Sequence, residues 1–162
     1  MIIRKLEKKD VKNMLECFQD KDNVKFLQIG YVDMKIEDCE KFISNSFNEN
    51  NMHFAIVDEN DDWCGTISLK NIDYKNLKAE YAIVTSKRVQ GKGMAYKATL
   101  ALRDYAFNEL KLNKIYLNVV VENERAFHFY EKCGFQYIGE TKKSVNINGS
   151  FHNLKWYEML NE

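Results

Sequence analysis

A glycine-rich turn is the feature of this sequence best suited to binding a ligand. The apolar, β-branched run Ile83-Val84-Thr85 is followed by Gln90-Gly91-Lys92-Gly93-Met94-Ala95, and a long stretch with helical periodicity begins there. Glycines let a ligand approach the main chain closely, and the first amides of a helix lack internal partners and lie at its positive end. The turn therefore predicts a site for an anion such as a pyrophosphate.

Taken alone, this turn is a weak signal. It has neither the G-x-x-x-x-G-K-[ST] spacing of a nucleoside triphosphate loop nor the G-x-G-x-x-G spacing of a dinucleotide fold, and it also fits a helix entry that binds nothing. A second segment changes this interpretation. It reads Asn123-Glu124-Arg125-Ala126-Phe127-His128-Phe129-Tyr130-Glu131-Lys132-Cys133-Gly134-Phe135. The turn fits the pattern [QR]-x-x-G-x-[GA], and the two motifs in this order are specific.

Together the two motifs resemble the GNAT superfamily of acetyl-CoA-dependent N-acetyltransferases, and in particular the branch of spermidine and ribosomal-protein N-terminal acetyltransferases. The resemblance is strongest over residues 63–160 and looser before them. It implies acetyl-CoA as the acetyl donor and no metal. The residues implied to bind acetyl-CoA are the main chain of Ile83, Val84 and Thr85, the turn Gln90, Gly91, Lys92, Gly93, Met94 and Ala95, and Asn123, Ala126, Phe127 and Tyr130.

The pantetheine arm of such a donor is extended and rich in amides, so it can add like a short strand to an unpaired sheet edge. The resemblance places that edge where the strands near residues 78–85 and 114–121 diverge. Asn123 has an alternative role, because its side chain suits the N-cap of the helix that follows it.

Tyr130 is the residue whose chemistry best suits the departure of a thiolate. A phenol with a pKa of about 10 can donate a proton or a hydrogen bond to a sulfur with a pKa of about 8.5. In similar enzymes the tyrosine of this segment is the general acid. The alternative is an aromatic ring on the buried face of its helix, near Phe127 and Phe135.

The acceptor amine must lose a proton before it attacks, since an ammonium has no lone pair. Glu80 resembles a glutamate common at this place in the family, and it faces a cleft if Tyr81 points away, because neighbours on a strand alternate in direction. A solvated carboxylate on a strand is the alternative. The oxyanion of the tetrahedral intermediate needs a donor, for which the main-chain N–H of Ile83 or Val84 is expected.

The elements that position these residues follow from hydrophobic periodicity. It predicts strands at residues 2–6, 52–57, 63–69, 78–84, 114–121, 135–145 and 151–160, and helices after an Asp10 N-cap and at 36–47, 93–110 and 123–133. The last two strands are expected to pair across Asn148-Gly149. This order, with the resemblance, predicts a single α+β domain over residues 1–162 with the GNAT-like fold, a mixed, mostly antiparallel twisted sheet that splays between its fourth and fifth strands and is flanked by helices.

The composition of the chain limits the partners, metal sites and cellular location that we expect for this domain. The 162 residues carry 24 basic and 24 acidic side chains, so no general attraction to nucleic acid or to an anionic membrane is expected. Scattered cysteines and histidines predict buried, reduced thiols and no zinc site. Without an apolar run of about 18 residues, a cytoplasmic protein is the default expectation.

The acceptor is the part that this sequence specifies least. We expect residues 20–47 and the hairpin 135–160 to form its site, with a polyamine, a protein N-terminus or an aminosugar as the amine that attacks directly in a ternary complex. Acids near residue 20 are offset by lysines, which weakens the case for a polyamine. The aromatic residues Phe26, Tyr31, Phe151 and Trp156 are expected to fill the core or an oligomer interface, or to stack on a sugar or base.

Two further possibilities concern the whole molecule. A non-catalytic acyl-CoA sensor or regulatory module is the alternative function, which Glu80 and Tyr130 disfavour. A homodimer is the expected assembly, with the strand 151–160 as a candidate edge for pairing.

Overall fold

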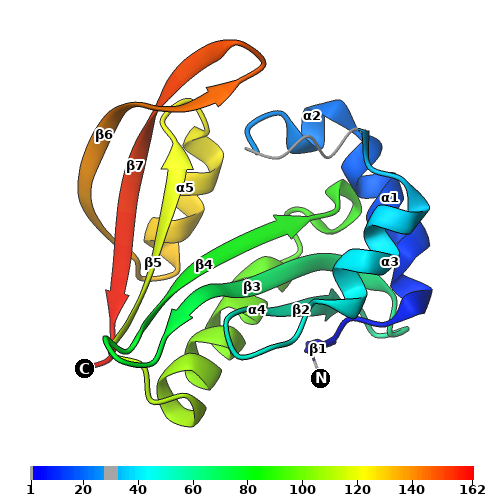
Figure 1. Ribbon diagram of the computed structural model, residues 1–162, viewed down its shortest axis with the longest axis horizontal. Helices are drawn as coiled ribbons and strands as arrows, with labels where there is room; N and C mark the ends of the chain where they lie inside the picture. Colours follow the sequence, from blue (N-terminus) through cyan, green and yellow to red (C-terminus); the bar gives the residue numbers. More distant parts are fainter. Residues whose placement is uncertain (1, 28–32) are drawn as a thin grey trace.

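The computed structural model describes residues 2–27 and 33–162. Within these residues, strands form one seven-stranded sheet in the order β1-β2-β3-β4-β5-β7-β6 (Figure 1). The strands are β1 Ile3–Lys5, β2 Met52–Val57, β3 Trp63–Asp73, β4 Lys78–Thr85, β5 Lys114–Val120, β6 Gln136–Ile147 and β7 Ser150–Leu160. The β4–β5 pair is parallel and the other neighbouring pairs are antiparallel. This topology confirms the fold predicted from the sequence.

Helices cover both faces of the sheet (Figure 1). The helices are α1 Val11–Gln19, α2 Lys21–Val24, α3 Ile36–Ser44, α4 Met94–Asp104 and α5 Glu124–Lys132. Apolar residues of α1, α2 and α3 pack with Ala55, Val57 and Trp63 on one face, whereas α4 and α5 pack over the large core on the other face. The helix expected over residues 93–110 is instead α4 followed by a π-helical turn, Tyr105–Glu109.

The strands β4 and β5 diverge soon after they begin. Their register pairs Lys78 with Lys114, Ala79 with Ile115 and Glu80 with Tyr116, and it extends no further along the described strands. Figure 1 shows the two strands separating beyond this point. On the sides that face each other, the second halves of β4 and β5 are therefore not paired with each other, as the family resemblance implied.

The C-terminal hairpin differs from the sequence expectation in one respect. β6 and β7 pair across Asn148 and Gly149, whose φ angles of 52° and 89° suit a tight hairpin turn. However, β7 also pairs with β5 over the full length of β5, so β7 is an interior strand and β6 is the edge. The prediction that strand 151–160 is an edge open to pairing was wrong, because the long-range β5–β7 register covers it.

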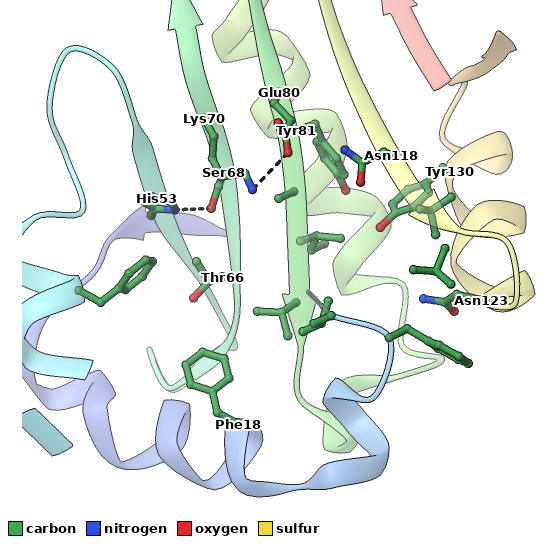
Figure 2. Close-up of a pocket in the computed structure, with 18 of the residues that line it drawn as sticks. Phe18, His53, Thr66, Ser68, Lys70, Glu80, Tyr81, Asn118, Asn123 and Tyr130 are labelled. Atoms are coloured by element: carbon green, nitrogen blue, oxygen red, sulfur yellow. Dashed lines mark hydrogen bonds and ion pairs between the residues drawn. The ribbon is translucent and has the colours of Figure 1, made fainter. Parts of the chain in front are cut away.

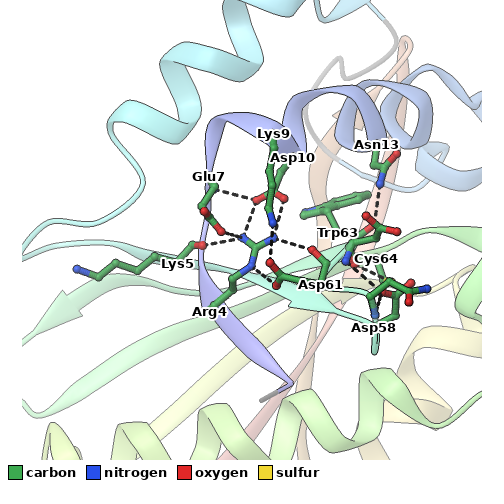
Figure 3. Close-up of polar contacts among 12 residues, drawn as sticks. Arg4, Lys5, Glu7, Lys9, Asp10, Asn13, Asp58, Asp61, Trp63 and Cys64 are labelled. Carbon is green, nitrogen blue, oxygen red and sulfur yellow. Dashed lines mark hydrogen bonds and ion pairs between the residues drawn. The ribbon is translucent and has the colours of Figure 1, made fainter.

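A charged cluster fixes the first strand to the start of α1 (Figure 3). The guanidinium of Arg4 donates to both carboxylate oxygens of Asp10 at 2.9 Å, and Arg4 also pairs with Asp61 at 2.7 Å. Asp10 precedes α1 as expected, but its side chain makes no cap bond to that helix and accepts from the Glu7 amide instead. An arginine within reach competes successfully for the carboxylate, because a bidentate ionic pair is stronger than a cap bond.

One further feature agrees with the sequence expectations. The cysteines Cys17, Cys39, Cys64 and Cys133 are free and buried. In the described part of the chain, the helices all fall short of the length and apolar character that a membrane crossing requires.

Candidate active site

A cavity of about 460 Å³ opens beside β4 (Figure 2). Its walls come from β2, β3, β4 and β5, from α1 and the segments around α2 and α3, and from the start and the later part of α5. His53, Ser68 and Thr66 lie on one side of β4 in this view, and Tyr130, Asn118 and Asn123 lie on the other. The cavity thus brings together residues that are far apart in the sequence.

The glycine turn lies beyond the end of β4 and leads directly into α4. Gly91 and Gly93 have φ angles of 81° and 75°, a left-handed conformation that glycine adopts at little cost. Gly93 is the N-cap of α4 and supplies no side-chain cap, and a Cβ built on it would meet no atom within 4 Å. The space beside Gly93 at the start of α4 is therefore open. This geometry fits the pyrophosphate of a coenzyme A molecule.

The hydrogen-bond alternation of the β3–β4 ladder shows which β4 groups face the opening. Ser86 N donates to Cys64 O at 2.8 Å, so in an antiparallel ladder Val84 is also bonded to β3, two residues away. Ile83 and Thr85 direct their N–H and C=O groups to the other side. The carbonyl of Thr85 indeed accepts a bond of 3.0 Å from Asn23 Nδ2. Of the two expected oxyanion donors, Ile83 has the suitable orientation and Val84 does not.

Tyr130 is 9% exposed and lines the cavity. Its ring packs edge-to-face against Tyr81 and Phe135, with centroids 5.8 and 6.1 Å apart, and its hydroxyl points toward β4 (Figure 2). Burial raises the pKa of Tyr130 above its usual range, with a smaller contribution from Cys133. The phenol therefore stays protonated near neutral pH and is available as a donor.

Glu80 lines the cavity in an ion pair. Its carboxylate lies 3.2 Å from Lys70 Nζ and accepts a weaker bond from Asn71 Nδ2 at 3.4 Å. Tyr81 points to the opposite face, where its hydroxyl bonds Thr99 Oγ1 at 2.7 Å. The alternation predicted for Glu80 and Tyr81 is confirmed. The pairing with Lys70 was not foreseen, since it depends on the β3–β4 register that places the two residues opposite each other.

A second polar pair in the cavity also escaped the sequence analysis. His53 Nδ1 lies 2.6 Å from Ser68 Oγ, and the ring packs against Phe42 with centroids 4.7 Å apart. Burial, and then the nearby charge of Lys70, lowers the pKa of His53 to about 4. The imidazole is therefore neutral at physiological pH. The signal that could have found this pair is the hairpin register, which sets His53 opposite Ser68.

Asn123 has the helix-capping role that was the alternative to contact with acetyl-CoA. Asn123 is the N-cap of α5, and its side chain accepts from Ala126 N at 3.4 Å while also lining the cavity. Ala126 is half-buried and Phe127 is buried beneath Lys155 Nζ, 3.9 Å from the ring centroid. Neither of these two residues lines the cavity of the described structure. Arg125 on α5 donates to Gln90 Oε1 at 2.9 Å and so connects α5 to the glycine turn.

The expected acceptor region is only partly confirmed. Phe26, Leu27, Met34 and Phe42 line the cavity, all from the expected segment 20–47. The described residues that line this cavity include none from the β6–β7 hairpin. The hairpin instead packs its buried residues Val145 and Leu154 against Val120, with Phe26 and Trp156 at the border of that cluster. Phe151 is exposed, and Tyr31 lies outside the described residues.

Comparisons with known proteins agree with this geometry. A family model for the acetyltransferase (GNAT) domain matches residues 1–136. The spermidine N(1)-acetyltransferase of Vibrio cholerae is 34% identical over 120 residues, which cover 74% of this chain and 69% of that protein. The putative ribosomal N-acetyltransferase YdaF of Bacillus subtilis is 38% identical over 97 residues, covering 60% of this chain and 53% of that protein. The match thus spans about half the length of this second relative.

A solved structure extends the likeness to nearly the whole chain. The crystal structure of spermidine N-acetyltransferase from Vibrio cholerae in complex with CoA and spermine has a TM-score of 0.88 and 28% identity. The alignment covers 98% of this chain and 94% of that one. The splayed β4 edge, the glycine turn at α4 and the family match together show that this chain belongs to the GNAT family of acetyltransferases.

Proposed function

We propose that this protein transfers the acetyl group of acetyl-CoA to a primary amine by direct attack in a ternary complex. One arrangement carries the proposal: the open β4 edge leads from the cavity to the uncapped start of α4, and Tyr130 faces that edge. An extended donor with a pyrophosphate at one end and a thioester at the other matches this path. The proposed donor contacts are the main-chain groups of Ile83 and Thr85, the turn from Gln90 to Ala95, and Asn123, Ala126, Phe127 and Tyr130. Val84 is left out because its main-chain groups bond β3.

Glu80 and Ile83 are proposed to act on the attacking side. Glu80 holds the incoming ammonium and accepts its proton, directly or through a water molecule, which gives the amine the lone pair it needs. The N–H of Ile83 then donates to the oxyanion that develops at the thioester carbonyl. A donor fixed in a strand needs no reorganisation at that moment, so it stabilises the transition state effectively.

Tyr130 is proposed to act on the leaving group. Its hydroxyl donates a hydrogen bond or a proton to the departing coenzyme A sulfur as the carbon–sulfur bond breaks. Burial raises the pKa of the phenol. The same burial also disfavours a bare thiolate, so the departing sulfur remains a good acceptor for the phenol proton. The reaction ends with an N-acetyl amine and free coenzyme A.

The acceptor candidates are a polyamine, a protein N-terminus and an aminosugar. The names of two relatives, a spermidine acetyltransferase and a putative ribosomal acetyltransferase, support the first two classes. The third rests on the sequence analysis alone.

Thiol release tests the proposal directly. Purified protein is incubated with acetyl-CoA and a panel of primary amines, while a thiol reagent reports coenzyme A and mass spectrometry reports acetylated amine. Equal amounts of both products, formed only when an amine is present, support the transferase. Binding of acetyl-CoA without any product would contradict it and favour a sensor, and thiol release without an amine would indicate hydrolysis.

A further inference from the structure

The charges that line the cavity are few and balanced. Among the described lining residues, Lys70 and Glu80 are the charged side chains, and they pair with each other at 3.2 Å. The chain has no aspartate or glutamate in residues 28–32, so this segment could not add a carboxylate. The cavity therefore offers an entering cation one carboxylate, and that carboxylate already has an ammonium partner.

Lys70 occupies the position that an acceptor ammonium would need. Lys70 and Glu80 are directly opposite each other in the β3–β4 register, and their side chains are only 35% and 20% exposed. An acceptor that brings one ammonium can exchange with Lys70 at Glu80 and then lose its proton for attack. A second ammonium on the same molecule would find the Glu80 carboxylate engaged and the Lys70 charge close by.

The lowered pKa of His53 shows that this part of the cavity disfavours a positive charge. Its ring lies in the cavity beside Ser68, and both burial and the Lys70 charge lower its pKa. A remote ammonium of a polyamine would meet the same two penalties, because burying an unpaired charge is costly. The rest of the described wall carries no Asp, Glu, Lys or Arg and includes the apolar side chains Phe18, Phe42 and Met34. Such a wall favours an apolar body.

We propose that the acceptor is a primary amine with one positive charge and an uncharged, apolar body, and that Lys70 sets this preference by neutralising Glu80. This inference rests on the proposed acetyl transfer and assigns the substrate class of that site. It separates this chain from relatives named for spermidine, since a polyamine would have to bury additional ammonium groups.

The test compares two amines that differ by a single charge. Pentylamine and cadaverine have the same five-carbon chain, and cadaverine adds a second terminal ammonium. We expect kcat/KM at saturating acetyl-CoA to be higher for pentylamine by about tenfold, which equals about 1.4 kcal/mol. The kcat/KM for spermidine, measured in the same assay, is expected to be no higher than that for cadaverine.

The variant Lys70→Met removes the charge and keeps the length of the side chain. It leaves Glu80 unpaired and makes the cavity net negative, so the preference for pentylamine over cadaverine is expected to fall by about threefold or more. Lys142→Met is the matched control, because Lys142 is exposed on β6 outside the cavity and its loss should leave the ratio unchanged.

The possible results distinguish an error in the acceptor class from an error in the proposed acetyl transfer. Wild-type protein that prefers cadaverine or spermidine would overturn the assigned acceptor class while leaving acetyl transfer intact. An unchanged ratio in Lys70→Met would overturn the role of Lys70. Acetyl-CoA binding with no product from any amine would instead contradict the proposed function itself.

Discussion

The stability of the protein should depend on pH through His53, a residue in the wall of the cavity. The pKa of this imidazole falls from 6.5 to about 4 on folding, mainly because of burial and then because of Lys70. The unfolded chain therefore binds a proton between these two values when the folded protein does not. Folding stability contributed by the neutral ring is complete above pH 6.5 and is lost as the pH falls toward 4.

The size of this effect follows from the two pKa values. Proton linkage gives a loss of about 2 kcal/mol by about pH 5 and about 3 kcal/mol once the folded protein is also protonated. Urea unfolding of wild type and His53→Asn across this range measures it. Asparagine places an amide near the position of Nδ1, so the contact with Ser68 Oγ is retained while the titration is removed.

The difference between the two proteins isolates the histidine from the many carboxylates that also titrate. We expect wild type to lose about 2 kcal/mol more than His53→Asn between neutral pH and about pH 5. His128→Asn serves as the control for replacing a histidine at an exposed position, because the side chain of His128 is 68% exposed. Parallel profiles for wild type and His53→Asn would show that protonation of His53 does not cause this loss of stability.

Three glycine substitutions, one of them a control, test the donor site and the sheet beside it. Gly93→Val should lose acetyl-CoA binding but retain the fold, because the valine side chain enters the open space before α4. Gly149→Val is the control: its hairpin φ of 89° imposes a similar backbone strain, but it should bind acetyl-CoA normally in calorimetry. Normal binding by Gly93→Val would show that the pyrophosphate lies elsewhere. Gly65→Ala should lower the free energy of unfolding by about 2 kcal/mol, since its Cβ would lie 2.6 Å from the carbonyl oxygen of Val84, and unchanged melting would contradict the close approach of β3 to β4.

Local patterns in the sequence predicted much of the fold. The hairpin of β2 and β3 was predicted because two apolar runs flank a compact polar turn, and β2 has the bounds expected for it. The orientation of Glu80 away from Tyr81 followed from strand alternation alone. Asn123 was predicted as a helix cap from its residue type and position, and the structure confirms that cap.

Features that depend on long-range register could not be predicted in this way. The Lys70–Glu80 pair requires knowing which β3 residue lies opposite each β4 residue. Asp10 has the residue type of a helix cap, but Arg4 on a neighbouring strand competes for its carboxylate. The interior position of β7 is set by its pairing with β5, which no local pattern encodes.

The π-helical turn after α4 was likewise missed. Periodicity continues smoothly through residues 93–110, so the apolar pattern gives no sign of the change in hydrogen bonding at Tyr105.

In the proposed reaction, acetyl transfer takes place in the cavity beside β4, and Tyr130 is the donor to the leaving thiolate. Tyr130→Phe tests it most directly, since phenylalanine retains the ring contacts with Tyr81 and Phe135 and removes only the hydroxyl. We predict that kcat with a reactive amine falls by about 100-fold or more while the Kd for acetyl-CoA stays unchanged. Undiminished kcat in this variant would show that Tyr130 is not the donor to the thiolate.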